Sequence, residues 1–487
     1  MTRLNHNTLF SARALKPAYE RRTLATGIVH LGIGAFHRAH QAFYTEMALA
    51  AGARGWGILG ASLRSPDTRD ALAPQDGLYT LSVRDGSGEK LQIIGAITRI
   101  VVAPEDPEAL VAAMAHRDIK IVSLTVTEKG YCHDPATGAL NEQHPDVLHD
   151  LANPQQPRSA PGFIIAALAL RRTAGLPPFT VLCCDNLPAN GRTVKRVLTR
   201  LAQLRDPALG KYVEAHLACP CTMVDRIVPA TTDEDRARIS QGIGCRDAWP
   251  VVTEPFTQWV IEDHFPQGRP DWGLAGAQFV TDVAPYELMK LRLLNGAHSC
   301  IAYLGYLSGC ETVAAAMANP DLVQFVQKLM AEDVTPILPA PEGADLPAYC
   351  AALVERFKNP ALKHRTWQIA MDGSQKLPQR LLGTIRAMLA KGADISRPAL
   401  GVAAWMAYVR GVDEKGAPID VRDPLAAQLR AIADAAGRDA GKLAAGLMAV
   451  EAIFGRDLAG DARFAGAVTE ALAGLLEQGA RESLRAV

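Results

Sequence analysis

The first half of the chain alternates short apolar runs with amphipathic segments of helical period. Four runs are typical of buried parallel strands: Ile28–Leu31, Trp56–Ala61, Ile119–Val126 and Phe179–Cys184. Helical segments lie between them at His40–Ala51, Pro107–Ala115 and Gly162–Ala174. Strands that alternate with helices predict a doubly wound α/β domain. Leu78–Val83 and Leu91–Ala96 flank a Gly-rich turn, which predicts a hairpin within that domain's sheet, and His144–Gly162, with its four prolines, predicts a loop.

After about residue 285, helical patterns dominate. The predicted helices are 285–306, 311–317, 320–332, 347–357, 378–391, 398–410, 424–437 and 461–485. Asp423 as N-cap and Pro424 at the first helical position predict the start of one of them, and 412–421 predicts a small hairpin. The expected layout is a Rossmann-type nucleotide-binding domain over 1–284 and a mostly α-helical substrate-binding and catalytic domain over 285–487.

The charge balance bears on possible partners. Lys+Arg and Asp+Glu both number 51 among 487 residues, so the formal net charge is zero, whereas nucleic-acid-binding proteins usually carry a basic surplus. We therefore expect a small-molecule substrate and no nucleic-acid partner. The sequence shows no membrane-spanning stretch and no secretion signal. Nine scattered cysteines predict reduced thiols and a cytoplasmic location.

A glycine pair follows the first predicted strand in IVHLGIGAFHRAHQAFY. Gly32 allows a tight turn and Gly34 lets a pyrophosphate approach the backbone, while His37 replaces the third glycine of the usual fingerprint. An ordinary strand-to-helix turn is the alternative, but the position in the α/β pattern favours cofactor binding, to which we also assign Phe36 and His37. No cysteine or carboxylate cluster joins His37 and His40, so no metal site is expected.

The loop after the second strand, LRSPDTRD, bears on the choice of cofactor. Asp67 could bind the ribose hydroxyls of NAD, whereas Arg64 could hold the 2′-phosphate of NADP. Both could instead be solvated loop charges. NAD is the expected cofactor.

Polar residues also follow two later apolar runs. Asn186, in VLCCDNLPANG, stands at the carboxyl end of a strand, where α/β sheets bind ligands, although an Asn-Leu-Pro turn also explains it. Asp225 and Arg226 lie inside TMVDRIVP, either as a buried ion pair or as part of a site.

The helix predicted at YELMKLRLLNGAHS carries Glu287, Lys290, Asn295 and His298 among its leucines. At about 100° per residue these four side chains fall within an arc of roughly 140°. Leucines share this arc, so it is not simply a solvated face.

Five segments, in order, carry a resemblance: GIGAFHRAHQA, SLTVTEKGY, CDNLPANG, TMVDRIVP and MKLRLLNGAHS. From about Ile28 to the C-terminus the chain resembles the mannitol dehydrogenase family of zinc-independent polyol and sugar-acid dehydrogenases. The resemblance implies a Rossmann-type N-terminal domain, a helical C-terminal domain and NAD-linked oxidation of a secondary alcohol.

The resemblance also implies roles for residues. Lys290 matches the general base, Asn186 and Asn295 match donors to the substrate oxygen, His298 matches a substrate-binding histidine, and Glu287 matches an acid that relays the proton. This chemistry is sound, because the hydroxyl proton must leave when hydride does, and amide donors stabilise the developing alkoxide. Desolvation favours the neutral amine that a base requires.

Further residues match family positions in the cleft where cofactor and substrate bind. Glu128, assigned to the cofactor side, and Asp225 match positions that line it, and Lys376, in MDGSQKLPQR, matches a substrate-contacting lysine. Glu287 could also form an ordinary i,i+3 ion pair with Lys290.

Within the family the chain most resembles the fructuronate reductases, which interconvert D-mannonate and D-fructuronate. The stretches that carry this are TEKGYC, MKLRLLNG, LKHRTWQIAMDGSQKLPQRLL and ALGVAAWMAYVRGVDE. Mannitol 2-dehydrogenases typically have Gly in place of Lys129 and Arg292 and an arginine in place of Gln368. The two cations suit a carboxylate substrate, although Arg292 faces another side of the helix from Lys290.

Two alternatives remain at this stage. GASLRSPD is closer to the polyol enzymes, so a mannitol 2-dehydrogenase or a related arabinitol or sorbitol dehydrogenase is the second expectation. A non-catalytic nucleotide sensor on the same scaffold would have lost the lysine, asparagine and histidine that this chain keeps.

Overall fold

The computed structural model describes residues 1–134 and 137–487. The chain forms two compact units, Met1–Ala284 and Pro285–Val487, and each is described by itself. Among the described residues, no helix combines the length and the apolar character needed to span a bilayer.

The N-terminal unit is built on a five-stranded parallel sheet. Its strands, in spatial order, are β5 (Ile97–Val102), β2 (Gly57–Ser62), β1 (Thr26–Leu31), β6 (Ile121–Leu124) and β7 (Thr180–Cys183). In chain order this is 3-2-1-4-5, the Rossmann order, with the switch point between β1 and β6. The doubly wound prediction and its four strands are confirmed; β5 is an additional edge strand.

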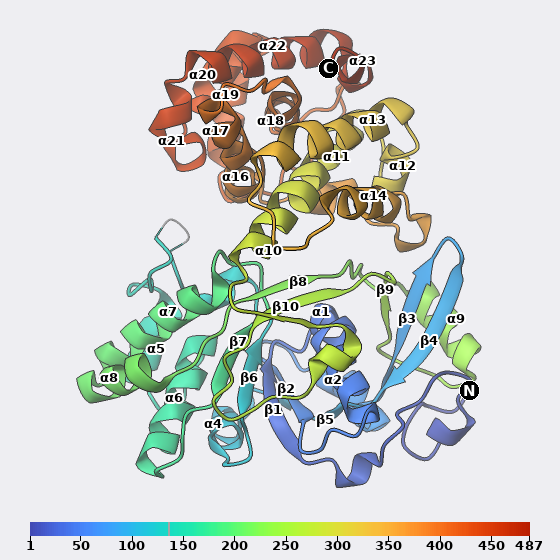
Figure 1. Ribbon diagram of the computed structural model, residues 1–487, viewed down its shortest axis with the longest axis vertical. Coiled ribbons are helices and arrows are strands. Elements are labelled where there is room, and N and C mark those ends of the chain that lie inside the picture. The colour runs from blue at the N-terminus through green and yellow to red at the C-terminus, as the bar shows by residue number, and fades with distance from the viewer. Residues whose placement is uncertain (135–136) are drawn as a thin grey trace. The chain divides into compact units, whose positions relative to one another are not determined.

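Helices cover both faces of this sheet because side chains alternate along each strand. Val29 and Leu31 of β1 pack with α4, α6, α7 and α8, whereas Ile28 packs on the other face with α2. Figure 1 shows α6, α7 and α8 together on one side of the strands. The helices of the unit are α1 (Ala35–Ala39), α2 (Gln41–Ala50), α3 (Asp67–Leu72), α4 (Pro107–Ala115), α5 (Pro145–Ala152), α6 (Ala160–Thr173), α7 (Asn190–Arg205), α8 (Pro207–His216) and α9 (Asp233–Ile243).

The predicted hairpin exists, but it does not belong to the main sheet. β3 (Tyr79–Asp85) pairs antiparallel with β4 (Gly88–Ile94) and parallel with β9 (Val251–Thr253), which makes a separate three-stranded sheet. A third sheet joins β8 (Thr222–Asp225), β10 (Gln258–Glu262) and β11 (Gln278–Val280). The alternating pattern predicts a strand correctly but carries no information on its partner.

The prediction of a loop over His144–Gly162 is wrong, because this stretch contains α5 and the start of α6. Pro145 occupies the first turn of α5, where its missing N–H costs nothing, and His144 Nδ1 accepts from the Asp146 N–H at 3.2 Å. Pro161 has the same role in the first turn of α6. A proline that begins a helix and a proline in a loop look alike in the sequence.

The C-terminal unit is helical, as predicted. Its α-helices are α10 (Ala284–Met289), α11 (Gly296–Leu307), α12 (Val313–Ala316), α13 (Pro320–Lys328), α14 (Leu346–Phe357), α15 (Thr366–Ala370), α16 (Gly373–Leu377), α17 (Gly383–Ala390), α18 (Ser396–Tyr408), α19 (Ala426–Ala436), α20 (Ala440–Met448), α21 (Glu451–Ala459), α22 (Ala462–Gln478) and α23 (Ala480–Arg485). Three π-helical segments continue helices of this unit: η6 (Lys290–Asn295), η7 (Leu329–Val334) and η10 (Pro378–Leu382).

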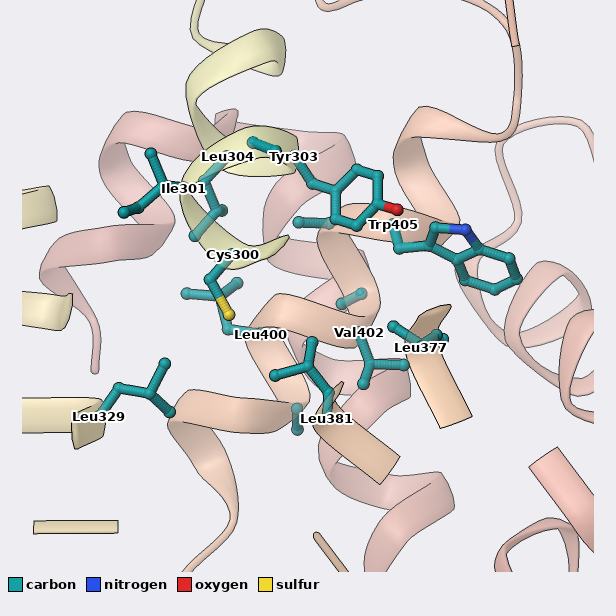
Figure 2. Close-up of a cluster of buried hydrophobic side chains, with 14 of the residues drawn as sticks. Cys300, Ile301, Tyr303, Leu304, Leu329, Leu377, Leu381, Leu400, Val402 and Trp405 are labelled. Atoms are coloured by element: carbon teal, nitrogen blue, oxygen red, sulfur yellow. The ribbon is translucent and has the colours of Figure 1, made fainter. Parts of the chain in front are cut away.

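The core of this unit forms where α11 meets α18 and η10. Figure 2 shows Cys300 of α11 among Leu381, Leu400 and other buried side chains. A Cβ on Gly401 would lie 2.5 Å from Cys300 Sγ, so only glycine lets α18 approach α11 this closely. The packing fixes α11, and with it the polar residues at its start.

Several local predictions in this unit need correction. α19 begins at Ala426, two residues later than predicted, with Leu425 at the N-cap position. The Asp423 carboxylate still accepts from the Leu425 N–H at 2.9 Å, and it also accepts from the Ser374 N–H and Oγ–H at 2.7 and 2.6 Å. The predicted hairpin at 412–421 is reduced to a single bridge between Val412 and Pro418. The helix predicted at 461–485 is broken at Gly479, whose φ is +83°.

Candidate active site

A cavity of about 920 Å³ opens in the N-terminal unit at the carboxyl ends of β1, β2 and β6. Its lining includes Gly32, Gly34, Ser62, Arg64, Thr125 and Lys129. This is the crevice at the switch point of the sheet, where proteins of this topology bind nucleotides. The residues around it could therefore hold a dinucleotide.

Gly32 is required at this crevice for a steric reason. Its φ is +91°, and a Cβ at this position would lie 2.1 Å from the Thr125 carbonyl oxygen. The turn after β1 is thus held against the end of β6, and the backbone remains open to a ligand.

The predicted cofactor residues do not all line the cavity. Of the described residues assigned to cofactor binding, Gly32, Gly34 and Arg64 line it, whereas Phe36, His37, Asp67 and Glu128 do not. Asp67 accepts from Ser65 Oγ at 3.0 Å and begins α3. Lys129, which was assigned to the substrate, lies on this cavity instead.

His37 packs in the interior of the unit. Its ring stacks on His30 with 3.4 Å between centroids, and burial first, then His30, holds its pKa well below the usual range. His40 Nε2 lies 2.9 Å from the Gln258 carbonyl oxygen, to which an N–H there would donate. His37 and His40 therefore help to pack the turn after β1.

The ends of β6 and β7 are joined by Asp185. Its carboxylate accepts from the Val126 and Thr127 N–H groups at 2.8 and 3.3 Å and from the Tyr131 hydroxyl at 2.7 Å. Burial raises the pKa of Asp185 to about 6. Thr127 has a φ of +63°, which is rare for a β-branched residue and marks a constrained turn. The turn presents Glu128 and Lys129 at the surface.

Asn186 follows Asp185 and is exposed at the same edge of the sheet. Asn190 in the same motif is structural: its Nδ2 donates to the carbonyl oxygens of Thr222 and Cys183 at 2.9 and 3.2 Å, so it joins β7 to β8. The motif thus divides into one residue that faces outward and one that holds the strands.

Asp225 and Arg226 are both buried at the end of β8. The Arg226 guanidinium donates to the carbonyl oxygens of Ala39 and Glu254. Arg226 therefore connects the end of β8 to the last residue of α1, and its burial lowers its pKa to about 10.

In the C-terminal unit, one helix carries the four polar residues of YELMKLRLLNGAHS, Tyr286–Ser299. Lys290 and His298 are buried, each 7% exposed, and Glu287 and Asn295 are half-buried. The helix is π-helical over Lys290–Asn295. A π-helical turn contains one more residue than an α-helical turn, so the residues after it are rotated back around the helix axis by about 100°. On a helical wheel, the arc that contains Glu287, Lys290, Asn295 and His298 then narrows from roughly 140° to about 80°.

His298 has an aromatic and cationic environment. Its ring lies 5.0 Å from that of Phe357 and 5.1 Å from that of His364, measured between centroids. Burial, then His364, Arg380, Arg356 and Lys376, hold the pKa of His298 well below its usual range. The lowered pKa favours a neutral imidazole at physiological pH.

Lys376 and Arg380 approach this helix from α16 and η10. The Lys376 ammonium donates to the carbonyl oxygens of Met371 and Ile369, and Arg380 Nη1 donates to Ser299 Oγ at 3.2 Å. A Cβ on Gly296 would lie 3.0 Å from the Arg380 carbonyl oxygen, so the two backbones are in close contact. Lys376 was predicted as a site residue, whereas Arg380 and His364 were not.

Comparison with known proteins accounts for both units. Residues 26–274 match the mannitol dehydrogenase Rossmann domain, and residues 282–476 match the mannitol dehydrogenase C-terminal domain. The chain belongs to the mannitol dehydrogenase family. It is accordingly an oxidoreductase that acts on an alcohol group, and the predicted resemblance is confirmed.

Similar members of the mannitol dehydrogenase family act on different substrates. The D-mannonate oxidoreductase of Escherichia coli (strain K12) is 49% identical and covers 97% of this chain and 98% of its own length. A mannitol 2-dehydrogenase of Aspergillus fumigatus is 42% identical over 96% of this chain and 94% of its own. The solved ternary complex of Pseudomonas fluorescens mannitol 2-dehydrogenase with NAD and D-mannitol has a TM-score of 0.92 at 40% identity, covering 100% of this chain and 99% of that one.

The structure thus places the predicted residues in two groups. Asn186, Asp225, Glu128 and Lys129 belong to the N-terminal unit. Lys290, Asn295, His298, Glu287, Arg292 and Lys376 belong to the C-terminal unit, in which η6 and η10 contact each other. Half-buried Arg292 has its pKa lowered by burial. His364 and Arg380 have no spacing relation to Lys290 in the sequence, so no local pattern could have identified them.

Proposed function

We propose that this member of the mannitol dehydrogenase family is an NAD-dependent fructuronate reductase, which interconverts D-mannonate and D-fructuronate. The 49% identity to a D-mannonate oxidoreductase over nearly the whole chain carries this proposal. The cationic environment of His298 supports it, because a sugar acid brings a carboxylate that a polyol lacks.

The cofactor proposal rests on the fit of the N-terminal cavity. Gly32 leaves the backbone accessible where a Cβ would collide with Thr125, and the cavity of about 920 Å³ has the size and place of a dinucleotide site. The solved relative that contains NAD adds support. When bound, the nicotinamide would supply or accept the hydride.

Lys290 is proposed as the general base in the C-terminal unit. Burial disfavours an ammonium ion, and a neutral amine can take the hydroxyl proton of the substrate as the carbonyl forms. Glu287, one helical turn before it, is proposed to pass the proton to solvent. In the reduction direction Lys290 returns the proton to the alkoxide.

Asn295, His298 and Asn186 are proposed to position the reacting oxygen. Amide N–H groups and a neutral imidazole donate hydrogen bonds that strengthen as negative charge develops on that oxygen. The neutral state of His298 suits this role, because it leaves Lys290 as the group that exchanges the proton. Asp225 and Lys376 are proposed to bind the hydroxyls of the sugar chain.

The test is a comparison of initial rates with NADH and either D-fructuronate or D-fructose in one buffer. A kcat/KM on fructuronate at least about tenfold higher is expected, since hydrogen bonds to a charged group contribute more than those to a neutral hydroxyl. A preference for fructose would contradict the proposal.

Mannitol 2-dehydrogenase is the second candidate function, favoured by the structural match to the Pseudomonas fluorescens enzyme. It predicts the opposite order of the two rates.

A further inference from the structure

Two neighbouring imidazoles in the C-terminal unit have buried nitrogens without a partner. Within the described part of the chain, His298 Nε2 and His364 Nδ1 have no hydrogen-bonding group in reach. The rings meet edge to face, 5.1 Å apart between centroids. Buried polar atoms are nearly always hydrogen-bonded, so a pair of unpartnered nitrogens on adjacent rings points to a bound ligand.

His364 reaches this place from the segment that precedes α15. Its backbone carbonyl accepts from the Val313 N–H at 2.9 Å, and the Arg365 backbone bridges to Thr312, so the segment is held against the start of α12. Burial lowers the pKa of His364 to about 4. Like His298, it is a neutral hydrogen-bonding group at physiological pH.

Cationic groups from three elements lie close enough to His298 to lower its pKa. Arg380 comes from η10, Lys376 from α16 and Arg356 from α14. The hydrogen bond from Arg380 Nη1 to Ser299 Oγ holds the guanidinium against the residue that follows His298, and the close contact between Gly296 and the Arg380 carbonyl fixes the backbone that carries it. Apart from burial, the groups that lower the pKa of His298 are therefore three cations and a second imidazole. Together they favour the binding of an anion at this place.

We propose that His364 and Arg380 bind the carboxylate of the substrate and so set the preference of this enzyme for a sugar acid over a polyol. A carboxylate has two oxygens with about four acceptor positions, which matches an arginine fork together with an imidazole N–H. This inference rests on the proposed function and deepens it. It moves carboxylate recognition away from Lys129, which lines the N-terminal cavity, and from Arg292.

The experiment compares two ketones that share one carbon skeleton. D-Fructuronate carries a carboxylate where D-fructose carries a hydroxymethyl group, so the ratio of their kcat/KM values with NADH isolates carboxylate recognition. The variants are Arg380→Gln, which removes the charge and the guanidinium fork, His364→Phe, which replaces the imidazole with a ring that has no donor, and Arg380→Lys, which keeps the charge. The control is Arg430→Gln, an exposed arginine of α19 that pairs with Asp434.

Arg380→Gln is expected to lower kcat/KM on fructuronate by about 10- to 100-fold and on fructose by less than about threefold. His364→Phe is expected to lower the ratio about tenfold, and Arg380→Lys to recover part of the loss. The control is expected to keep the wild-type ratio. Should Arg380→Gln fail to fold by circular dichroism, His364→Phe and Arg380→Lys still measure the ratio.

The outcomes separate this inference from the proposed function. A wild-type enzyme that prefers fructuronate, with variants that lose both activities equally or neither, would overturn the carboxylate subsite and leave the proposed function intact. A wild-type enzyme that prefers fructose would overturn both. A selective loss on fructuronate supports the subsite.

Discussion

Lys290 combines a charged side chain with an almost completely buried position, 7% exposed, on a helix crowded with leucines. An amine is costly to place there, since desolvation penalises its charged form. The π-helical turn over Lys290–Asn295 narrows the angle around the helix axis between Lys290 and the later residues Asn295 and His298. The π-helical turn and the polar residues therefore occur in the same stretch of helix, as is frequent at functional sites.

Replacing Lys290 with alanine should remove proton transfer and leave cofactor binding unchanged. We expect kcat to fall by about 10²- to 10⁴-fold, the usual contribution of a general base, while NADH binds with wild-type affinity by fluorescence titration. Lys391→Met, which removes an exposed lysine of the same unit, is the matched control. Turnover that survives in Lys290→Ala would show that another group is the base.

At the scale of the element, α2 is joined to the edge of the N-terminal unit by a buried acid. Glu46 is 1% exposed, and its carboxylate accepts from the Tyr19 hydroxyl and the Gly95 N–H, both at 2.7 Å. Burial raises the pKa of Glu46 to about 7. Gly95 connects β4 to β5, so the acid fixes the corner at which the chain passes between two sheets.

This acid should make stability depend on pH. Because the folded-state pKa lies above the unfolded one, the native state keeps a proton between about pH 4.5 and 7 that the unfolded chain has released, so stability falls as the pH rises through this window. The free energy of unfolding, measured in urea, should fall between pH 4.5 and pH 8 by about 2–3 kcal/mol more in the wild type than in Glu46→Gln. Equal losses in the two proteins would mean that Glu46 does not titrate there.

At the scale of the whole molecule, the hydrophobic cores divide along the chain. The core of the C-terminal unit is built from residues between Met289 and Leu484, and the cores of the N-terminal unit lie between Leu4 and Ala277. Units with cores of their own can fold independently.

Separate expression of Met1–Ala284 and Pro285–Val487 should therefore give two folded fragments with different capacities. The N-terminal fragment is expected to bind NADH within about tenfold of the full chain's affinity, because the cavity and Gly32 lie within it. It should show no turnover, since Lys290 is on the other fragment. Titration of NADH fluorescence and circular dichroism measure both properties; a folded N-terminal fragment that ignores NADH would refute the assignment of the cavity.

Features that depend only on neighbouring residues could be predicted from the amino-acid sequence. Period and composition located four strands of the main sheet, and the turn with Gly32 followed from its place after the first of them. The resemblance of MKLRLLNGAHS supplied the polar helix and its family. These features are local, because the period of a strand or helix and the φ of a glycine are set within a few residues.

Contacts between distant segments, in contrast, became visible only in the folded chain. It paired β3 with β9 rather than with the main sheet, placed Lys129 on the nucleotide-type cavity, and brought His364 and Arg380 to His298. The π-turn at Lys290–Asn295 also escaped a helical wheel drawn at a constant period. Such contacts arise from the packing of whole elements, and strand alternation or helical period says which side of an element is buried but not what covers it.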